Sequence, residues 1–231
     1  MLNNAEYLGP GIVVYRDVFP ESMNLINRLE DSLGKSDGKH KWKQATTGYS
    51  NSDLKYRDCF DFKIKKNSDD SLMLSNQRVE VNEKKEADIE LEKIWQDSYN
   101  AQLNPIKDYM QMFNIAPLNY WESFNFVKYG KDQHFQVHSD HGYSYICVLS
   151  SVGYINDNYA GGELYFDKFN LKIKPKAGDL YLFPSAYIYS HASLPIEDGV
   201  KYSIVTMLDY LEAPHTPQYR DIEKKYTDGY K

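Results

Sequence analysis

The residues best suited to chemistry lie in one short segment, His134-Phe-Gln-Val-His138-Ser-Asp140-His141. His138 and Asp140 are two positions apart, so on a β-strand they point to the same face with roughly 6.6 Å between their Cα atoms. An imidazole and a carboxylate at that spacing can converge on one metal ion if a third ligand comes from another strand. His191 is a candidate, since it precedes the last predicted strand. Two histidines and one carboxylate suit non-haem Fe(II) that must also bind a co-substrate and dioxygen.

Two other interpretations of the segment stay open at this point. A single His-x-Asp pair is not rare by chance in a chain with 6 His and 20 Asp, so the histidines are also explained as ordinary surface or core residues of a β-domain. On a helix, His134, His138 and His141 would share a zinc ion. The segment lies between Gly130 and Gly142 and is short for a helix, and on a strand His134 and His138 would be roughly 13 Å apart.

A second pair of residues, Lys201 and Ser203, indicates a binding site for an anionic ligand. Lys201 and Ser203 open the last predicted strand and again point to one face. An ammonium and a hydroxyl side by side form a receptor for one carboxylate of a small dicarboxylate. The alternative is that Lys201 is a solvent-facing lysine at a strand end, which is the commoner place for a lysine.

These residues must be positioned by strands in the second half of the chain. Hydrophobic periodicity predicts a strand over 11–18, a helix that begins near Phe19-Pro20 and ends at Gly34, and a helix over 87–113 that Pro105 kinks or divides. After Pro117 the period becomes two. Glycine turns separate the strands predicted there, which favours a sandwich or barrel. The predicted strands are 121–129, 133–138, 143–149, 163–166, 171–173, 179–183 and 201–208.

Composition limits the classes of protein. The chain has 231 residues, 42% hydrophobic content and a net charge of 27 − 33 = −6, which favours a globular domain over a general nucleic-acid coat. Tyrosine is in excess, with 21 Tyr against 10 Phe, as expected for half-buried strand positions. The two cysteines, Cys59 and Cys147, form no disulfide framework, and neither a signal peptide nor an apolar run of membrane length is evident. We therefore expect a cytoplasmic chain with no membrane partner.

Several motifs in order resemble one known family. The segment from Tyr129-Gly130 through Gln133 and Phe135 to His138-Ser-Asp140 resembles the proximal metal motif of prolyl 4-hydroxylase-like Fe(II)/2-oxoglutarate dioxygenases. Gly161-Gly162-Glu163-Leu-Tyr-Phe166, Pro175-Lys-Ala-Gly178-Asp179 with Phe183, and the segment His191 to Ser203 follow in the order that the family shows. The resemblance is strong over 120–210, weak over 10–34, and extends loosely to phage-encoded members, for which the compartment would be the host cytoplasm.

The resemblance implies a fold and a set of roles. The fold would be mostly β with N-terminal helices (α+β), a double-stranded β-helix of the jelly-roll or cupin type flanked by helices. His138, Asp140 and His191 would bind Fe(II). Lys201 and Tyr129 would bind the C5 carboxylate of 2-oxoglutarate, and Ser203 would assist.

The implied reaction is hydroxylation of an unactivated C–H bond, with release of succinate and CO2 and with ascorbate as a possible reductant. The presence of Asp140 favours hydroxylation over halogenation, because halogenating relatives lack this carboxylate. The first candidate substrate is a prolyl residue of a peptide or protein. A nucleobase, a free small molecule and a catalytically silent binding module are the alternatives, and the oligomeric state is open.

The substrate cleft is the part where the chain departs from the family. The arginine that often follows the His-x-Asp motif is absent here, and Tyr143 and Tyr145 stand in its region. We expect Tyr143, Tyr145, Trp121 and Arg57 to line the cleft, although packing inside the barrel explains the aromatic residues at least as well.

The domain organisation follows from the same patterns. We expect a single dioxygenase domain over 1–211, with helical support at 19–113, a barrel core at 120–210 and a polar tail at 212–231. Segment 35–66 carries nine Lys/Arg and four Asp/Glu, and the sequence leaves open whether it covers a substrate or forms a solvated, mobile face.

Overall fold

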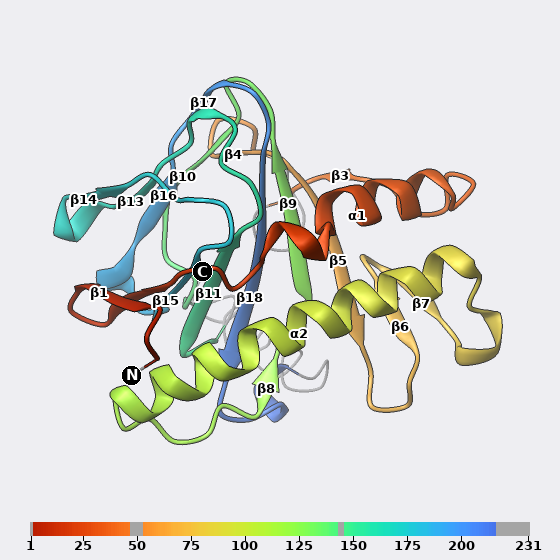
Figure 1. The fold of residues 1–231 in the computed structure, drawn as a ribbon, viewed down its shortest axis with the longest axis horizontal. Helices are drawn as coiled ribbons and strands as arrows, with labels where there is room; N and C mark the ends of the chain where they lie inside the picture. Colours follow the sequence, from red (N-terminus) through yellow and green to blue (C-terminus); the bar gives the residue numbers. More distant parts are fainter. Residues whose placement is uncertain (1, 47–52, 143–145, 216–231) are drawn as a thin grey trace, which may run out of the picture.

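The computed structural model describes residues 2–46, 53–142 and 146–215, and in these residues two α-helices lie against β-sheets (Figure 1). The helices are α1 (Leu25–Gly34) and α2 (Glu86–Met112). Single turns of 3-10 helix are η1 (Glu21–Met23), η2 (Val81–Glu83), η3 (Asp167–Phe169), η4 (Tyr187–Tyr189) and η5 (Ala213–His215).

The described strands form a large sheet, a smaller sheet and a short pair. The large sheet has the order β1-β2-β15-β11-β18-β9-β5-β6-β7, with β3 paired to β5 and β8 paired to β18. The smaller sheet has the order β14-β13-β16-β10-β4, and β12 pairs with β17. The strands of the first half of the chain are β1 (Ala5–Gly9), β2 (Ile12–Tyr15), β3 (Lys43–Gln44), β4 (Arg57–Asp58), β5 (Phe60–Lys66), β6 (Leu72–Leu74) and β7 (Gln77–Val79). Those of the second half are β8 (Tyr120–Trp121), β9 (Phe124–Tyr129), β10 (His134–His138), β11 (Leu149–Tyr154), β12 (Ala160–Gly161), β13 (Leu164–Phe166), β14 (Leu171–Ile173), β15 (Leu180–Pro184), β16 (His191–Ser193), β17 (Ile196–Asp198) and β18 (Lys201–Asp209).

Two hydrophobic layers hold this arrangement together. One face of the large sheet packs against α1 and α2, with Phe62, Phe124 and Phe126 buried among the helix residues. The other face packs against the smaller sheet through a second core that includes Val152, Phe166 and Phe183. Because side chains alternate along a strand, β2, β11 and β15 of the large sheet contribute residues to both layers. The predicted mostly β fold with N-terminal helices is thereby confirmed.

The first half of the chain differs from the prediction of a helical support. Strand β5 lies inside the large sheet, paired with β9 on one side and β6 on the other, and β6 and β7 lie where no strand is predicted. The interpretation of segment 35–66 as a mobile face is therefore wrong for Phe60–Lys66. Its alternating charged and apolar residues are a two-faced strand, with Phe62 and Ile64 in the core.

The other differences concern element boundaries. Helix α2 is not divided, because Pro105 sits inside one continuous helix. The strand predicted over 143–149 is wrong for residues 146–148 and ends too early, since β11 runs from Leu149 to Tyr154, while residues 143–145 lie outside the described residues. Tyr154 at the end of β11 pairs with Ser203, so this strand lies in the centre of the large sheet. No helix in the described residues is both long and apolar enough to cross a membrane.

Candidate active site

A cavity of about 370 Å³ opens between the two sheets. Its floor on the large sheet is formed by alternate residues of β9 and β18, and its roof by the ends of β10, β13 and β16. The strands place on its wall all of the described residues that the sequence singles out for metal and co-substrate: Tyr129, His138, Asp140, His191, Lys201 and Ser203.

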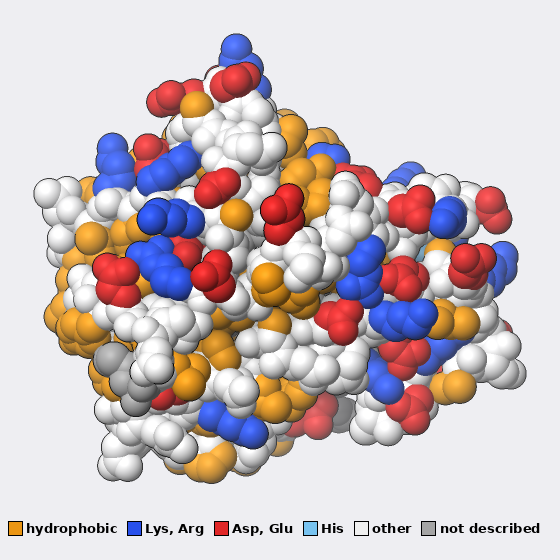
Figure 2. Space-filling model, viewed as in Figure 1, with side chains coloured by type: hydrophobic (Ala, Val, Ile, Leu, Met, Phe, Trp, Pro, Cys, Tyr) orange, Lys and Arg blue, Asp and Glu red, His pale blue; other side chains and the backbone are white. Residues whose placement is uncertain are grey.

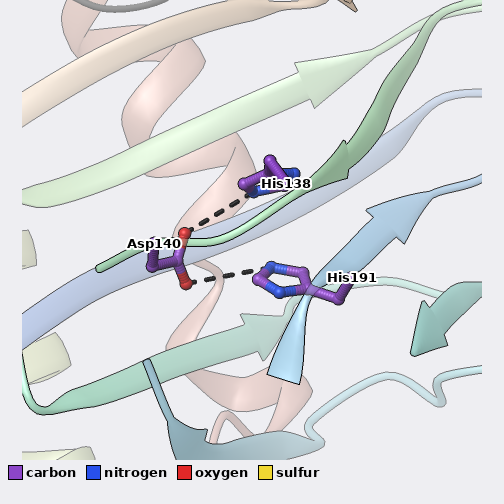
Figure 3. Close-up of side chains that lie close together, drawn as sticks. All are labelled: His138, Asp140 and His191. Carbon is purple, nitrogen blue, oxygen red and sulfur yellow. Dashed lines mark ion pairs between the residues drawn. The ribbon is translucent and has the colours of Figure 1, made fainter. Parts of the chain in front are cut away.

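His138, Asp140 and His191 converge at one point of this wall, and their side chains point toward one another (Figure 3). His138 ends β10 and His191 begins β16, and the two strands pair with these residues opposite each other. Asp140 follows β10 by two residues. Its Oδ1 lies 3.5 Å from His138 Nε2 and its Oδ2 lies 3.8 Å from His191 Nε2. Two ligands at about 2.1 Å from one ion can be at most about 4.2 Å apart, so both spacings fit a shared metal.

A hydrogen bond at Nδ1 of each of these two histidines leaves its Nε2 free to bind a metal ion. His138 Nδ1 lies 2.9 Å from the Gln136 carbonyl oxygen, and His191 Nδ1 lies 3.1 Å from that of Tyr189. A protonated Nδ1 that donates to a carbonyl leaves the lone pair on Nε2, which is the form that binds a metal ion. Burial lowers the pKa of His191 to about 4, so its imidazole is neutral in this environment.

Asp140 is held as a carboxylate. Burial alone would raise its pKa, but the neighbouring imidazoles of His191 and His138 and the hydroxyl of Ser150 together hold the pKa below its ordinary value. Ser150 Oγ donates to Asp140 Oδ2 at 2.6 Å and lies 2.8 Å from Ser185 Oγ. Two imidazoles and one fixed carboxylate are a donor set that fits Fe(II).

The zinc alternative has no support in the geometry. His134 lies on the strand β10, where its two ring nitrogens contact the carbonyl oxygens of Asp132 and Lys55. His141 Nδ1 lies 2.7 Å from the carbonyl oxygen of Cys147. Within the described ranges, the group of histidine, cysteine and acidic residues that could hold a metal is His138, Asp140 and His191.

A buried lysine, Lys201, also lines the cavity, and it is the first residue of β18. It is 1% exposed, and Nζ lies over the Tyr129 ring at 4.3 Å from its centre. Nζ donates to Ser193 Oγ and, at 3.2 Å, to the carbonyl oxygen of Gly162. No carboxylate pairs with it among the described residues, and burial lowers its pKa to about 7. A buried ammonium without a counter-ion is costly, so this end of the cavity fits an anionic ligand such as a carboxylate.

The backbone conformation at Gly162 explains why the motif Gly161-Gly162-Glu163-Leu-Tyr-Phe166 contains a glycine at this position. Gly162 has φ +66°, and a Cβ there would lie 2.4 Å from Ile196 Cδ1. Only glycine fits this position, and its carbonyl is thereby aimed at Lys201. Tyr129 and Lys201 are directly opposite each other in the pairing of β9 with β18, and Ser203 lies on the same face two residues further on.

The structure places the four residues expected to line the substrate cleft in different surroundings. Arg57 lines the cavity. Trp121 does not line it, and its ring packs 4.8 Å from that of Tyr99 on α2, so the expectation for Trp121 is corrected: it fills the core between helix and sheet. Tyr143 and Tyr145 lie outside the described residues.

Sequence reasoning missed several wall residues, among them Lys63, Asn125, Phe135 and Ser193. The Phe135 ring stacks on the His138 ring at 3.6 Å. Asn125 could have been found from the sequence. It is spaced evenly with Val127 and Tyr129 on one strand, which puts it on the same face as Tyr129, the proposed co-substrate ligand.

Comparison with known proteins identifies the fold and the domain. Residues 124–208 match the model of the 2OG-Fe(II) oxygenase superfamily. This region is a 2OG-Fe(II) oxygenase domain. The match begins at the first residue of β9 and ends one residue before the end of β18, so it contains the metal-site residues and the Tyr129–Lys201 pair.

The relatives of this oxygenase domain include prolyl 4-hydroxylases. The chain is 29% identical over 132 residues to the "Putative prolyl 4-hydroxylase" of Acanthamoeba polyphaga mimivirus, a match over 48% of this chain and 54% of that protein. The chain thus spans about half the length of this curated relative.

Solved structures share the fold at lower identity. A Pseudomonas putida prolyl-4-hydroxylase superposes with a TM-score of 0.59 and 18% identity over 86% of this chain and 92% of that one. A Trichoplax adhaerens prolyl hydroxylase in complex with a hypoxia inducible factor peptide fragment superposes with a TM-score of 0.61 and 15% identity over 86% and 83%. The predicted double-stranded β-helix is confirmed.

Proposed function

We propose that this chain is an Fe(II)- and 2-oxoglutarate-dependent dioxygenase that hydroxylates a C–H bond of a peptide or protein, with a prolyl residue as the first candidate. The observation that carries the proposal is the convergence of His138, Asp140 and His191 on the wall of a cavity that also holds the buried Lys201, which pairs with no carboxylate among the described residues. A metal site and an anion site in one cavity are what this co-substrate requires. We propose one domain over 1–211 and a tail over 212–231.

The proposed roles follow from the contacts of each residue. His138 and His191 present Nε2 to the metal, and Asp140 completes the ligand set as a carboxylate fixed by Ser150. Lys201 neutralises the C5 carboxylate of 2-oxoglutarate, while Tyr129 and Ser203 supply further hydroxyl contacts from the same sheet face. The metal with its co-substrate and dioxygen supplies the oxidising chemistry that places one oxygen atom in the substrate and releases succinate and CO2.

A peptide substrate is supported by the relatives. The mimivirus relative is named as a prolyl 4-hydroxylase, and the Trichoplax structure contains a bound peptide fragment. Two basic residues of the first half of the chain are engaged in ion pairs, which lowers the positive charge available to a nucleic acid: Lys66 lies 3.0 Å from both Asp70 and Glu92, and Lys84 lies 2.6 Å from Glu92. Figure 2 accordingly shows basic and acidic side chains interspersed on the face that carries α2 and the β6–β7 hairpin. Both cysteines are free and buried, which fits the cytoplasmic location that we propose.

The test is a turnover assay with the full chain, Fe(II), ascorbate, 2-oxoglutarate and a library of proline-containing peptides. We expect succinate formation that a peptide stimulates, and a product peptide heavier by one oxygen atom. Asp140→Ala and Lys201→Met should abolish both signals. Succinate without any modified peptide would reject the prolyl substrate, and failure of the wild-type chain to bind 2-oxoglutarate would reject the function itself.

A further inference from the structure

Two buried polar atoms on the cavity wall have no hydrogen-bond partner among the described residues, Arg57 Nε and Asn125 Oδ1. Buried polar atoms are nearly always paired, so each unpaired one calls for an explanation. The other three unpaired atoms of the described chain are on Ser98, Gln102 and Tyr159, which do not line the cavity. One open donor and one open acceptor in the same cavity point to a ligand that offers both complementary groups.

Asn125 faces the cavity because of its place on β9. Phe124 and Phe126 on either side of it are buried in the core beneath the helices, so Asn125 points to the opposite face with Val127 and Tyr129. Its register partner on β5 is Lys63, which also lines the cavity. Directly opposite residues of an antiparallel pair have Cβ atoms about 5 Å apart, so the Lys63 and Asn125 side chains leave the sheet side by side, within reach of one ligand group.

The Lys63 ammonium is available to a ligand. It has no ion pair and no side-chain hydrogen bond in the described parts of the chain, unlike Lys66 on the same strand, which pairs with two carboxylates. The neighbouring lysine on the same face, Lys65, does not line the cavity and lies over the Tyr120 ring at 4.8 Å. Lys63 therefore presents donors beside the open acceptor of Asn125.

This pair lies away from the proposed co-substrate position. Asn125 precedes Tyr129 by four residues on one strand, a separation of roughly 13 Å. That is longer than an extended 2-oxoglutarate molecule bound at Lys201 and Tyr129. The Asn125–Lys63 end of the cavity is thus left for the substrate.

Arg57 brings the second open atom close to the metal site. Its guanidinium lies over the Phe135 ring at 4.7 Å, and that ring stacks on His138. Nη1 donates to the carbonyl oxygen of Thr46 at 3.0 Å and Nη2 lies 3.8 Å from Asp61, which leaves Nε as the open donor.

We propose that Asn125 and Lys63 bind an amide group of the substrate main chain, with the substrate N–H donating to Asn125 Oδ1 and its carbonyl oxygen accepting from Lys63. Arg57 Nε binds another carbonyl of the same chain. At this end of the cavity the substrate is thereby recognised as a polypeptide through its backbone. This inference rests on the proposed function and names the residues that would set its substrate class.

The experiment compares Asn125→Leu, which removes the acceptor at similar volume, with the wild-type chain and with Lys65→Met as the matched control. Binding of 2-oxoglutarate to the Mn(II)-loaded proteins is measured first, and we expect it to be equal in all three. Binding of the proline-containing peptide library is then measured on the same loaded proteins. We expect peptide Kd to rise about tenfold in Asn125→Leu, by a similar factor in Lys63→Met, and not in Lys65→Met.

A backbone ester tests the hydrogen bond itself. Peptides in which one amide next to the target residue is replaced by an ester lack that N–H. We expect one such ester to weaken binding to the wild-type chain about tenfold and to leave binding to Asn125→Leu unchanged. The inference is overturned if the ester weakens both proteins equally, if Asn125→Leu binds peptides normally, or if free proline or nucleosides bind and peptides do not. Loss of 2-oxoglutarate binding by the wild-type chain would instead overturn the proposed function.

Discussion

The Lys201 ammonium lies 4.3 Å above the centre of the Tyr129 ring, and no carboxylate of the described chain pairs with it. Among the described residues, the cation is stabilised by the ring faces of Tyr129 and Tyr154, by Ser193 and by the Gly162 carbonyl. Such an environment leaves the charged form poorly compensated until an anion arrives.

The first prediction is a pH-dependent affinity for 2-oxoglutarate. Burial lowers the pKa of Lys201 to about 7, so in the free protein the ammonium loses its proton as pH rises through that value. Because the dianion binds the protonated form, Kd should be flat below pH 7 and rise toward about tenfold per pH unit above it. Isothermal titration of the Mn(II)-loaded protein in buffers of different ionisation enthalpy should also detect proton uptake at pH 8. A Kd independent of pH between 6 and 9 would contradict the assignment.

The second prediction concerns the metal. Asp140→Ala should lose Mn(II) binding, as followed by electron paramagnetic resonance, because it removes the only charged ligand of the proposed set. In wild type, metal at about 100 times its Kd should stabilise the fold by about 2.7 kcal/mol, and this gain should vanish in the variant. His134→Gln is the matched control, since its ring nitrogens contact only backbone carbonyls. Equal metal binding by Asp140→Ala and wild type would refute the site.

The third prediction concerns Gly162. Alanine at φ +66° is strained, and its Cβ would meet Ile196 at 2.4 Å, so Gly162→Ala should lower the free energy of unfolding by about 1–3 kcal/mol. It should also weaken 2-oxoglutarate binding, because the carbonyl that holds Lys201 would shift. Gly34→Ala, at the open end of α1, should be neutral or stabilising by up to about 1 kcal/mol. Urea denaturation of both variants makes the comparison.

The fourth prediction concerns Glu30, on the helix side of the large sheet. Glu30 Oε1 accepts from Lys128 Nζ at 2.7 Å and from the Tyr202 hydroxyl at 2.8 Å, and Oε2 accepts from Trp42 Nε1. Burial would raise its pKa, but these three donors hold the pKa below its ordinary value.

The two strand residues that Glu30 ties together adjoin the proposed co-substrate ligands. Lys128 pairs with Tyr202 in the register that also sets Tyr129 opposite Lys201. Glu30→Gln should therefore raise Kd for 2-oxoglutarate about threefold to tenfold and leave Kd for Mn(II) unchanged. Asp31→Asn, in an exposed pair with Lys35, is the control. A parallel loss of both affinities would indicate general destabilisation in place of a positioning role.

The difference between predicted and observed strands has a physical cause in each case. Strand β11 is buried along its whole length and contains Gly153, so it lacks the polar–apolar alternation that identifies a half-exposed strand. Strands β6 and β7 are three residues each, too short for a period to emerge. By contrast β18 is nine residues long, and its predicted bounds agree with the structure to within one residue.

The sequence by itself determined the types and order of the chemical groups: His138 and Asp140 at strand spacing, His191, and the Lys201–Ser203 pair. Local spacing is enough for this, because residues two apart on a strand share a face whatever the rest of the chain does. Only the tertiary structure decided which residues these groups lie opposite. The pairing of β10 with β16 sets His138 opposite His191, that of β9 with β18 sets Tyr129 opposite Lys201, and that of β5 with β9 sets Lys63 beside Asn125. These contacts join residues far apart in the chain, and their register is fixed by burial of the opposite sheet faces, which no short segment of sequence contains.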